Sequence, residues 1–209
     1  NDPFRSHENP QDRALYRERL EQVYRSMAEA TAEWVDRESV LVFPPKNGGI
    51  FVEEVFRTVG LGTHFFDYRM SRVQDNAGGL TVGVNLGKVN PRISDYRTFV
   101  FADDCIASDI SAHATLMIIQ EQLREAGINT SDARTLITVS AASQRGLESL
   151  TSPAVQKHFG FSELSAVVGI LVFKMDNHFY LRHPDDRFVV GDMGNWTKSP
   201  KPTTDTNPR

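Results

Sequence analysis

The first part of the chain mixes apolar and charged residues with the period of an α-helix. Apolar side chains recur three or four positions apart and so share one face, while the charged residues between them fall on the other. Pro10 suits the first turn of a helix, because its missing N–H is not needed there. The pattern predicts a helix from Pro10 to about Trp34, with an apolar face that includes Leu15, Leu20, Val23, Tyr24, Met27 and Ala28.

Beyond this helix the chain changes to short, continuous apolar runs separated by polar loops. Such runs are typical of buried parallel strands, and we expect strands at 39–43, 63–70, 97–102, 134–142 and 165–173. Amphipathic stretches at 50–60 and 111–126 predict helices that end at Gly60 and Gly127. Residues 71–79 predict a polar loop, and residues 80–85 predict a strand of a flexible hairpin.

Strands that alternate with helices define the fold class. They indicate an α/β fold with a mostly parallel central sheet, helices on both faces, the N-terminal helix and a small hood. A length of 209 residues fits one domain with a small appendage. The Pro- and Thr-rich residues 199–209 predict a disordered tail.

Composition narrows the function classes. A formal net charge of -4 argues against a general nucleic-acid or membrane-surface partner, which usually requires a basic face. Cys105 is the single cysteine, so no internal disulfide can form. The first twenty residues lack the layout of a signal peptide, and no apolar stretch is long enough to span a bilayer. We therefore expect a cytoplasmic protein.

Two acids follow the apolar run at 97–102. In a parallel sheet, ligands bind beyond the carboxyl ends of the strands. There, one of Asp103 and Asp104 could accept hydrogen bonds from sugar hydroxyls and the other could meet a hydrated Mg²⁺. The alternative is an acidic strand end with a helix cap nearby.

The next loop leads into a predicted helix. Residues 107–111 read Ala107, Ser108, Asp109, Ile110 and Ser111. N–H groups at a helix N-terminus favour an anion, and the two serine hydroxyls can add donors. Asp109 opposes this interpretation, because its charge repels a phosphate or caps the helix itself. Ile110 carries a branched side chain where glycine would let a ligand approach closely, and Ser111 is also a plausible N-cap.

The loop after the run at 39–43 offers a cation and glycines. Lys46, Asn47 and Gly48 suit a pyrophosphate through backbone amides and one ammonium group. A plain strand-to-helix turn explains the same residues equally well. Searches for a P-loop, a dinucleotide fingerprint and histidine-based metal ligands find no match.

Together these loops resemble type I phosphoribosyltransferases, most closely uracil phosphoribosyltransferase. The family's strand, acid pair and Ala-Thr-Gly-Gly-Ser/Thr loop correspond to "VFADDCIASDISA", and its Lys-Leu-Pro segment to "KVNPRISDYR". The segments "PPKNGG", "FFDYRMSR", "LITVSAASQRGLESL" and "FVVGDMGNW" resemble, in order, its pyrophosphate loop, a Tyr-Arg-Asp strand, a strand-plus-helix segment and its uracil-binding segment. The resemblance covers most of residues 38–198 and implies a domain there, after an arm and helix at 1–37.

The resemblance implies transfer of ribose 5-phosphate from phosphoribosyl pyrophosphate to a uracil-like base, with Mg²⁺. Asp103 and Asp104 would be the catalytic and metal-binding acids, and residues 107–111 would bind the 5-phosphate. Pyrophosphate would be bound by Lys46, Asn47 and Gly48, with Arg69 or Lys88 closing over it. The base would be bound by Val190, Gly191, Asp192, Met193 and Gly194.

This sequence departs from the family at two places. Ser108-Asp109-Ile110 replaces Thr-Gly-Gly, and Asn195-Trp196 replaces the Asp and Arg of the base-binding segment. A non-catalytic relative that binds a nucleotide or another ligand in a regulatory role is therefore the alternative. The resemblance also implies self-association, for which the helix bearing Tyr16, Tyr24 and Trp34 is a candidate face, unless that helix packs on its own core.

Overall fold

The central sheet contains four parallel strands. The computed structural model describes residues 10–45, 50–61, 64–74, 80–106, 110–172, 174–175, 181–182 and 189–190. The strands are β1 (Val40–Phe43), β4 (Thr98–Ile106), β5 (Arg134–Ser143) and β6 (Glu163–Val172), in the order β1-β4-β5-β6. Their first residues lie side by side, with Val40 opposite Thr98, Thr98 opposite Arg134 and Arg134 opposite Glu163. The predicted parallel α/β sheet is confirmed.

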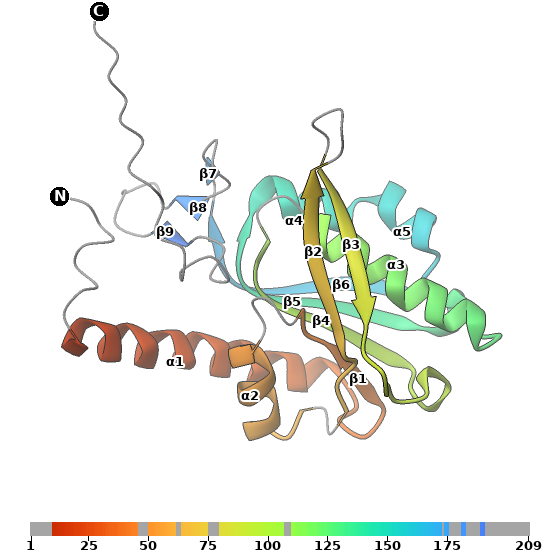
Figure 1. Cartoon of the computed structure of the whole chain (residues 1–209), viewed down its shortest axis with the longest axis horizontal. Helices are drawn as coiled ribbons and strands as arrows, with labels where there is room; N and C mark the ends of the chain where they lie inside the picture. The colour runs from red at the N-terminus through yellow and green to blue at the C-terminus, as the bar shows by residue number, and fades with distance from the viewer. Residues whose placement is uncertain are drawn as a thin grey trace, which may run out of the picture.

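Helices cover both faces of this sheet, as Figure 1 shows. On one face, α1 (Pro10–Trp34) and α2 (Ile50–Thr58) share a core with Val100 and Ala102 of β4. On the other face, α3 (Ile110–Glu125), α4 (Gln144–Thr151) and α5 (Pro153–Phe159) pack with Phe99 and Phe101. Because side chains alternate along a strand, the continuously apolar run of β4 supplies both cores.

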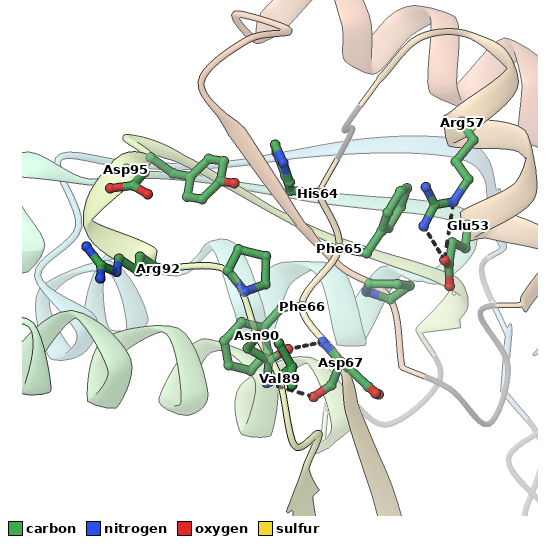
Figure 2. Close-up of a pocket in the computed structure, with 13 residues that line it drawn as sticks. Glu53, Arg57, His64, Phe65, Phe66, Asp67, Val89, Asn90, Arg92 and Asp95 are labelled. Carbon is green, nitrogen blue, oxygen red and sulfur yellow. Dashed lines mark hydrogen bonds and ion pairs between the residues drawn. The ribbon is translucent and has the colours of Figure 1, made fainter.

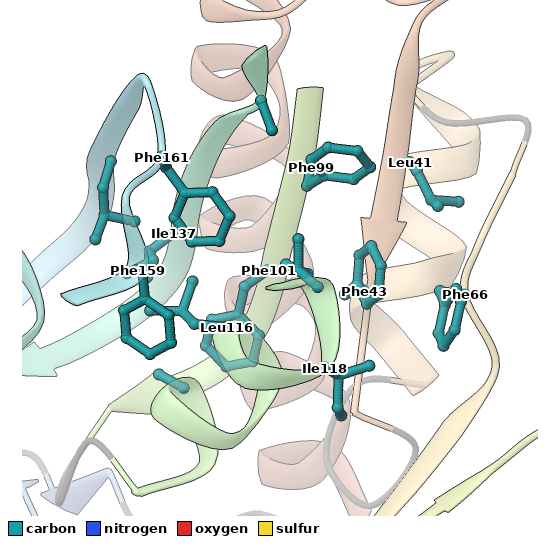
Figure 3. Packing of buried hydrophobic residues seen from close by; sticks show 14 of the residues in the cluster. Leu41, Phe43, Phe66, Phe99, Phe101, Leu116, Ile118, Ile137, Phe159 and Phe161 are labelled. Atoms are coloured by element: carbon teal, nitrogen blue, oxygen red, sulfur yellow. The ribbon is translucent and has the colours of Figure 1, made fainter. Parts of the chain in front are cut away.

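The core under α3 is rich in aromatic rings (Figure 3). Phe43 of β1 stacks on Phe66 with ring centroids 4.6 Å apart, and Phe159 stacks on Phe161 at 5.9 Å. Leu116 of α3 is fully buried in the same cluster. This packing fixes α3 against the sheet and so fixes where its N-terminus lies relative to β4.

The N-terminal helix is part of the main core. Tyr24 and Met27 are buried against the sheet, while Trp34 is 55% exposed. Thr31 Oγ1 donates a hydrogen bond to the Met27 carbonyl (2.8 Å) and lies 2.7 Å from Thr138 Oγ1 of β5. Tyr24 is therefore not available to a dimer face, and the helix packs on its own core.

The second predicted strand differs from the structure. Beside β1 this segment forms an isolated parallel bridge, between Phe65 and Val42, and no longer strand pairing among the described residues. The strand instead runs from Tyr68 to Gln74 (β2) and pairs antiparallel with β3 (Leu80–Leu86), so part of the predicted polar loop belongs to β2. The mostly polar segment Ser71–Gln74 forms a strand because β3 supplies its hydrogen bonds, which the hydrophobic pattern does not encode. The predicted hairpin strand at 80–85 is confirmed.

Small elements complete the chain. A three-stranded antiparallel sheet contains β7 (Lys174–Met175), β8 (Leu181–Arg182) and β9 (Val189–Val190). With the β2–β3 hairpin it is the appended structure outside the central sheet. Two 3₁₀ turns, η2 (Ile93–Asp95) and η3 (Thr130–Asp132), precede β4 and β5. The predicted tail at 199–209 lies outside the described residues.

Local capping fixes the helices that follow β5. Ser143 accepts a hydrogen bond from the Gly146 N–H (2.9 Å) at the start of α4, and Ser152 accepts one from the Val155 N–H (3.3 Å) at the start of α5. Gly160 ends α5 with a φ of 67°, a conformation that glycine adopts without steric cost. These caps turn the chain back across the sheet into β6.

Candidate functional site

The connections that leave β1 and β4 run to opposite faces of the sheet. After β1 the chain enters α2, which packs on one core, and after β4 it enters α3, which packs on the other. Phe65 lies beside β1 on the edge away from β4. β1 and β4 are therefore the switch point of this sheet, and open α/β sheets bind their ligands in a crevice at such a point, beyond the carboxyl ends of the strands.

A cluster of polar groups lies among buried side chains at this point. The Tyr68 hydroxyl is 3.3 Å from the carbonyl of Phe43, the last residue of β1, and 2.9 Å from Thr115 Oγ1. Thr115 in turn donates to the Ser111 carbonyl in the first turn of α3 (3.0 Å). The cluster thus joins the end of β1, the hairpin and the start of α3.

Asp103 is the charged member of this neighbourhood. It is buried, at 7% exposure, and lies in β4 opposite Val139 of β5. Burial raises the pKa of the Tyr68 phenol well above its ordinary value of 10.0, the hydrogen bond to Thr115 lowers it, and the negative charge of Asp103 raises it further. Tyr68 therefore remains a neutral hydroxyl near a buried carboxylate.

The predicted acids lie inside the strand rather than after it. β4 continues to Ile106, so Asp103 and Asp104 belong to the sheet and not to the loop. Parallel pairing with β5, through Asp103 opposite Val139 and Cys105 opposite Ala141, extends the strand past the apolar run. The side chain of Asp104 lies outside the described residues.

The other predicted site residues that the structure describes lie in different places. Ile110 and Ser111 begin α3 and are half-buried, one residue earlier than the expected helix start. Arg69 is exposed and pairs with Asn85 on the hairpin, on the face opposite Tyr68. Lys88 is exposed just after β3. The described residues thus bring together Asp103, Tyr68 and the start of α3, with Arg69 and Lys88 on the hairpin.

Several predicted residues lie outside the described part of the chain. These are the pyrophosphate residues Lys46, Asn47 and Gly48, the loop residues Ala107, Ser108 and Asp109, and the base-binding residues Gly191, Asp192, Met193 and Gly194. The backbone of Val190 lies in β9, and its side chain is not described.

A cavity of about 560 Å³ adjoins the carboxyl end of β1 (Figure 2). Its wall includes Pro44, which immediately follows β1, and residues from α2, from 64–67 and from 89–96. Arg57 forms an ion pair with Glu53 (2.8 Å) and lies over the Phe65 ring, 4.3 Å from its centroid. The cavity therefore offers a guanidinium group held against an aromatic ring.

In another wall of the cavity, the side chain of Asn90 forms hydrogen bonds with the backbone of Asp67. Its Oδ1 accepts a hydrogen bond from the Asp67 N–H (2.6 Å), and its Nδ2 donates to the Asp67 carbonyl (3.1 Å), as the dashed lines in Figure 2 mark. The Gly87 N–H donates to the same carbonyl (2.7 Å). Sequence reasoning assigned no role to this wall, and the sequence signals available were the aromatic pair at 65–66 and the asparagine before Pro91.

The described residues contain no group of three or more His, Cys, Asp or Glu side chains that could hold a metal ion. A Mg²⁺ ion that binds together with a substrate needs fewer protein ligands, because one or two carboxylates, phosphate oxygens and waters complete its coordination. The buried Asp103 is a donor of the right kind. Among the helices that the structure describes, none is long and apolar enough to cross a membrane.

Comparisons with known proteins give structural likenesses only. No protein-family model matches the chain, and no curated protein matches its sequence. The AQ2163 protein from Aquifex aeolicus is similar at 14% identity and a TM-score of 0.48, over 70% of this chain and 61% of that protein. A hypothetical protein from Neisseria gonorrhoeae with bound ppGpp is similar at 11% identity and 0.43, over 74% of this chain and 80% of that one.

Adenine phosphoribosyltransferase is also among the similar structures. The enzyme from Thermoanaerobacter pseudethanolicus has 11% identity and a TM-score of 0.37, over 70% of this chain and 77% of that enzyme.

Proposed function

We propose that this protein binds phosphoribosyl pyrophosphate at the switch point and transfers ribose 5-phosphate to a uracil-like nucleobase. The observation that carries the proposal is the buried carboxylate of Asp103 in the strand next to β1, close enough to the Tyr68 hydroxyl to raise its pKa. That hydroxyl is joined through Thr115 to the first turn of α3. A carboxylate is an acceptor for ribose hydroxyls, and the first-turn N–H groups of α3, which receive no partner within the helix, point toward its N-terminal end.

Ile110 is less of an obstacle to phosphate binding than its position in the sequence suggests. Its half-buried side chain lines an apolar groove between α3 and β3, together with Val82 and Val84. The side chain is therefore accounted for by packing on the hairpin. Asp109 then remains as the residue that disfavours a phosphate.

The reaction needs no nucleophilic side chain. The bond from the sugar C1 to the pyrophosphate oxygen breaks, with the electron pair leaving on pyrophosphate. A ring nitrogen of the base bonds to C1 and its proton passes to solvent. The protein's part is to position both reactants and to neutralise the leaving group. Mg²⁺, when bound, would supply charge neutralisation on the pyrophosphate, and one of Asp103 and Asp104 would hold it directly or through water, because adjacent residues of a strand face opposite sides of the sheet.

A second function is a non-catalytic one, in which the same crevice binds a nucleotide or another ligand in a regulatory role. Asp109 favours it, because a carboxylate directly before α3 competes with a phosphate for the helix N–H groups. The two functions share the crevice and differ in turnover.

The test is a calorimetric titration of the full chain with phosphoribosyl pyrophosphate and Mg²⁺, followed by pyrophosphate release with a panel of bases. Asp103→Asn should weaken binding roughly tenfold or more, because a hydrogen bond to a charged group is lost. The matched control is Asp132→Asn, an exposed acid in η3, which should leave binding unchanged.

The outcomes separate the two functions. Binding with pyrophosphate release supports the transferase, and binding without release for any base supports the regulatory alternative. Failure of both the unmodified protein and Asp109→Gly to bind would refute the phosphosugar site. Equal effects of the Asp103 and Asp132 variants would remove Asp103 from it.

A further inference from the structure

An apolar groove runs between β3 and α3, with Ile110 at the start of α3 in its wall. It encloses about 1010 Å³ and includes Val82, Val84 and Leu86 of β3 and Met117 of α3. Val84 is 42%, Leu86 44% and Met117 60% exposed, although all three are large apolar side chains. Figure 1 shows the hairpin with β3 next to α3. Apolar surface gathered in one groove is typical of a contact site.

The backbone beside this groove is an open strand edge. β3 pairs with β2 and with no other strand among the described residues. The Gly87 N–H donates to the Asp67 carbonyl, so Asp67 and Gly87 form a hydrogen-bonded pair of the antiparallel ladder. The next pair in the same register is Tyr68 opposite Leu86. Pairs alternate along an antiparallel ladder. The N–H and C=O groups of Val82, Val84 and Leu86 therefore point to the open edge.

The open edge is complementary to itself. Two copies of β3 placed antiparallel about a two-fold axis at Val84 would put Val84 opposite Val84 and Val82 opposite Leu86. Every residue in these pairs directs its backbone groups outward, so each pair would be of the hydrogen-bonded kind. A two-fold contact must be self-complementary in this way.

The side chains fit the same arrangement. Residues 80–86 read LTVGVNL and carry no charge, whereas exposed edge strands usually carry charges or proline that prevent pairing. In the groove wall the acidic residue is Glu121, which is already paired with Arg124. Pairing would therefore extend the apolar faces of two hairpins over two α3 helices without burying an unpaired charge.

We infer that β3 is the dimer interface of this protein, with a second copy of the chain adding its own β3 edge to edge to form a continuous four-stranded sheet and close the apolar groove. This inference is independent of the proposed function, because no residue in it belongs to the crevice cluster around Asp103 and Tyr68.

The test is sedimentation velocity of the full chain over a wide range of concentration. The unmodified protein should be a dimer. Val84→Lys places two like charges opposite each other at the axis, and Val84→Pro removes an outward N–H while leaving the bonds to β2 intact. Each should raise the dissociation constant roughly tenfold or more. The matched control is Asn85→Lys, on the same strand but with its backbone toward β2 and its side chain on the other face, which should leave the dimer unchanged.

Amide hydrogen exchange gives a readout that needs no variant. Protection of the Val82, Val84 and Leu86 amides should rise with protein concentration, while that of the β2-bonded Gly83 and Asn85 amides should not. A monomer at all concentrations would overturn the inference. So would a dimer that Val84→Lys and Val84→Pro, folded by circular dichroism, leave intact. If neither variant folds, the exchange pattern decides, and concentration-independent protection of the three outward amides overturns it.

Discussion

A buried pair of threonine hydroxyls joins the N-terminal helix to the sheet and yields an asymmetric prediction. Thr31 of α1 and Thr138 of β5 are both fully buried, and their Oγ1 atoms lie 2.7 Å apart. Thr31 uses its one proton on the Met27 carbonyl, so Thr138 must donate to Thr31. The two residues are therefore not equivalent, although they are of the same type.

The expected changes in the free energy of unfolding follow from which hydroxyl donates each hydrogen bond. Thr138→Val removes one hydrogen bond and leaves Thr31 bonded to Met27, so it should cost about 1 kcal/mol. Thr31→Val removes both bonds and leaves the Thr138 hydroxyl buried without a partner, which should cost about 3 kcal/mol. The double variant leaves no buried hydroxyl unpaired and should recover about 2 kcal/mol relative to Thr31→Val.

Urea unfolding followed by circular dichroism measures all three variants, with the slope m checked for constancy. The control is Thr135→Val. Thr135 Oγ1 is buried and lacks a hydrogen-bond partner, so replacing it by a methyl group should raise stability by about 1 kcal/mol. Additive effects of the Thr31 and Thr138 variants, or a larger cost for Thr138→Val than for Thr31→Val, would refute the reasoning.

Three further predictions concern titration and packing. Because Tyr68 has a raised pKa, the stability that its neutral hydroxyl contributes is fully present below pH 10.0 and is lost as the pH rises toward the folded-state pKa. Tyr68→Phe should reduce this loss of stability at alkaline pH, measured by urea unfolding. Glu163 has a pKa lowered from 4.5 by its hydrogen bond to Arg134. Its contribution is present above 4.5 and is lost as the pH falls through the folded-state pKa, and because the pair is exposed, Glu163→Gln should cost less than about 1 kcal/mol at neutral pH. At Gly87 an added Cβ would lie 2.5 Å from Asp67 Cγ, so Gly87→Ala should lower stability by about 1–3 kcal/mol in thermal unfolding.

Each of these has a contrary result that is easy to recognise. An alkaline loss that Tyr68→Phe does not change would place the responsible group elsewhere. A Glu163→Gln profile that matches the parent between neutral and acid pH would show that the ion pair contributes nothing. A Gly87→Ala variant as stable as the parent would mean that the Asp67 side chain moves without cost.

The hydrophobic pattern predicted the elements whose packing it directly encodes. The continuous apolar runs became β1, β4, β5 and β6, because a parallel sheet buries both faces of every strand. The i, i+3, i+4 pattern became α1, and Tyr24 and Met27 lie where that pattern put them, on the buried face. The alternation of strands and helices was enough to predict helices on both faces.

The candidate site was predictable only in part. Asp103 was found because an acid directly after an apolar run is unusual, and the structure buries it at the switch point. Tyr68 lies 35 positions before Asp103 in the sequence, and its hydrogen-bond partner Thr115 lies 12 positions after Asp103. No local sequence motif therefore joins the three residues. The cavity wall at Arg57, Phe65 and Asn90 was missed for the same reason.

By itself, the sequence determined the four central strands and the helices α1, α2 and α3, since local periodicity and turn residues report what each segment can bury. Tertiary structure decided how far β4 extends, that β2 pairs with β3, and that β3 has no second partner strand in the part of the chain that the structure describes. The physical reason is that a strand's length and pairing depend on hydrogen-bond partners supplied from elsewhere in the chain. A hydrophobic pattern records burial, and it does not record which backbone groups find a partner.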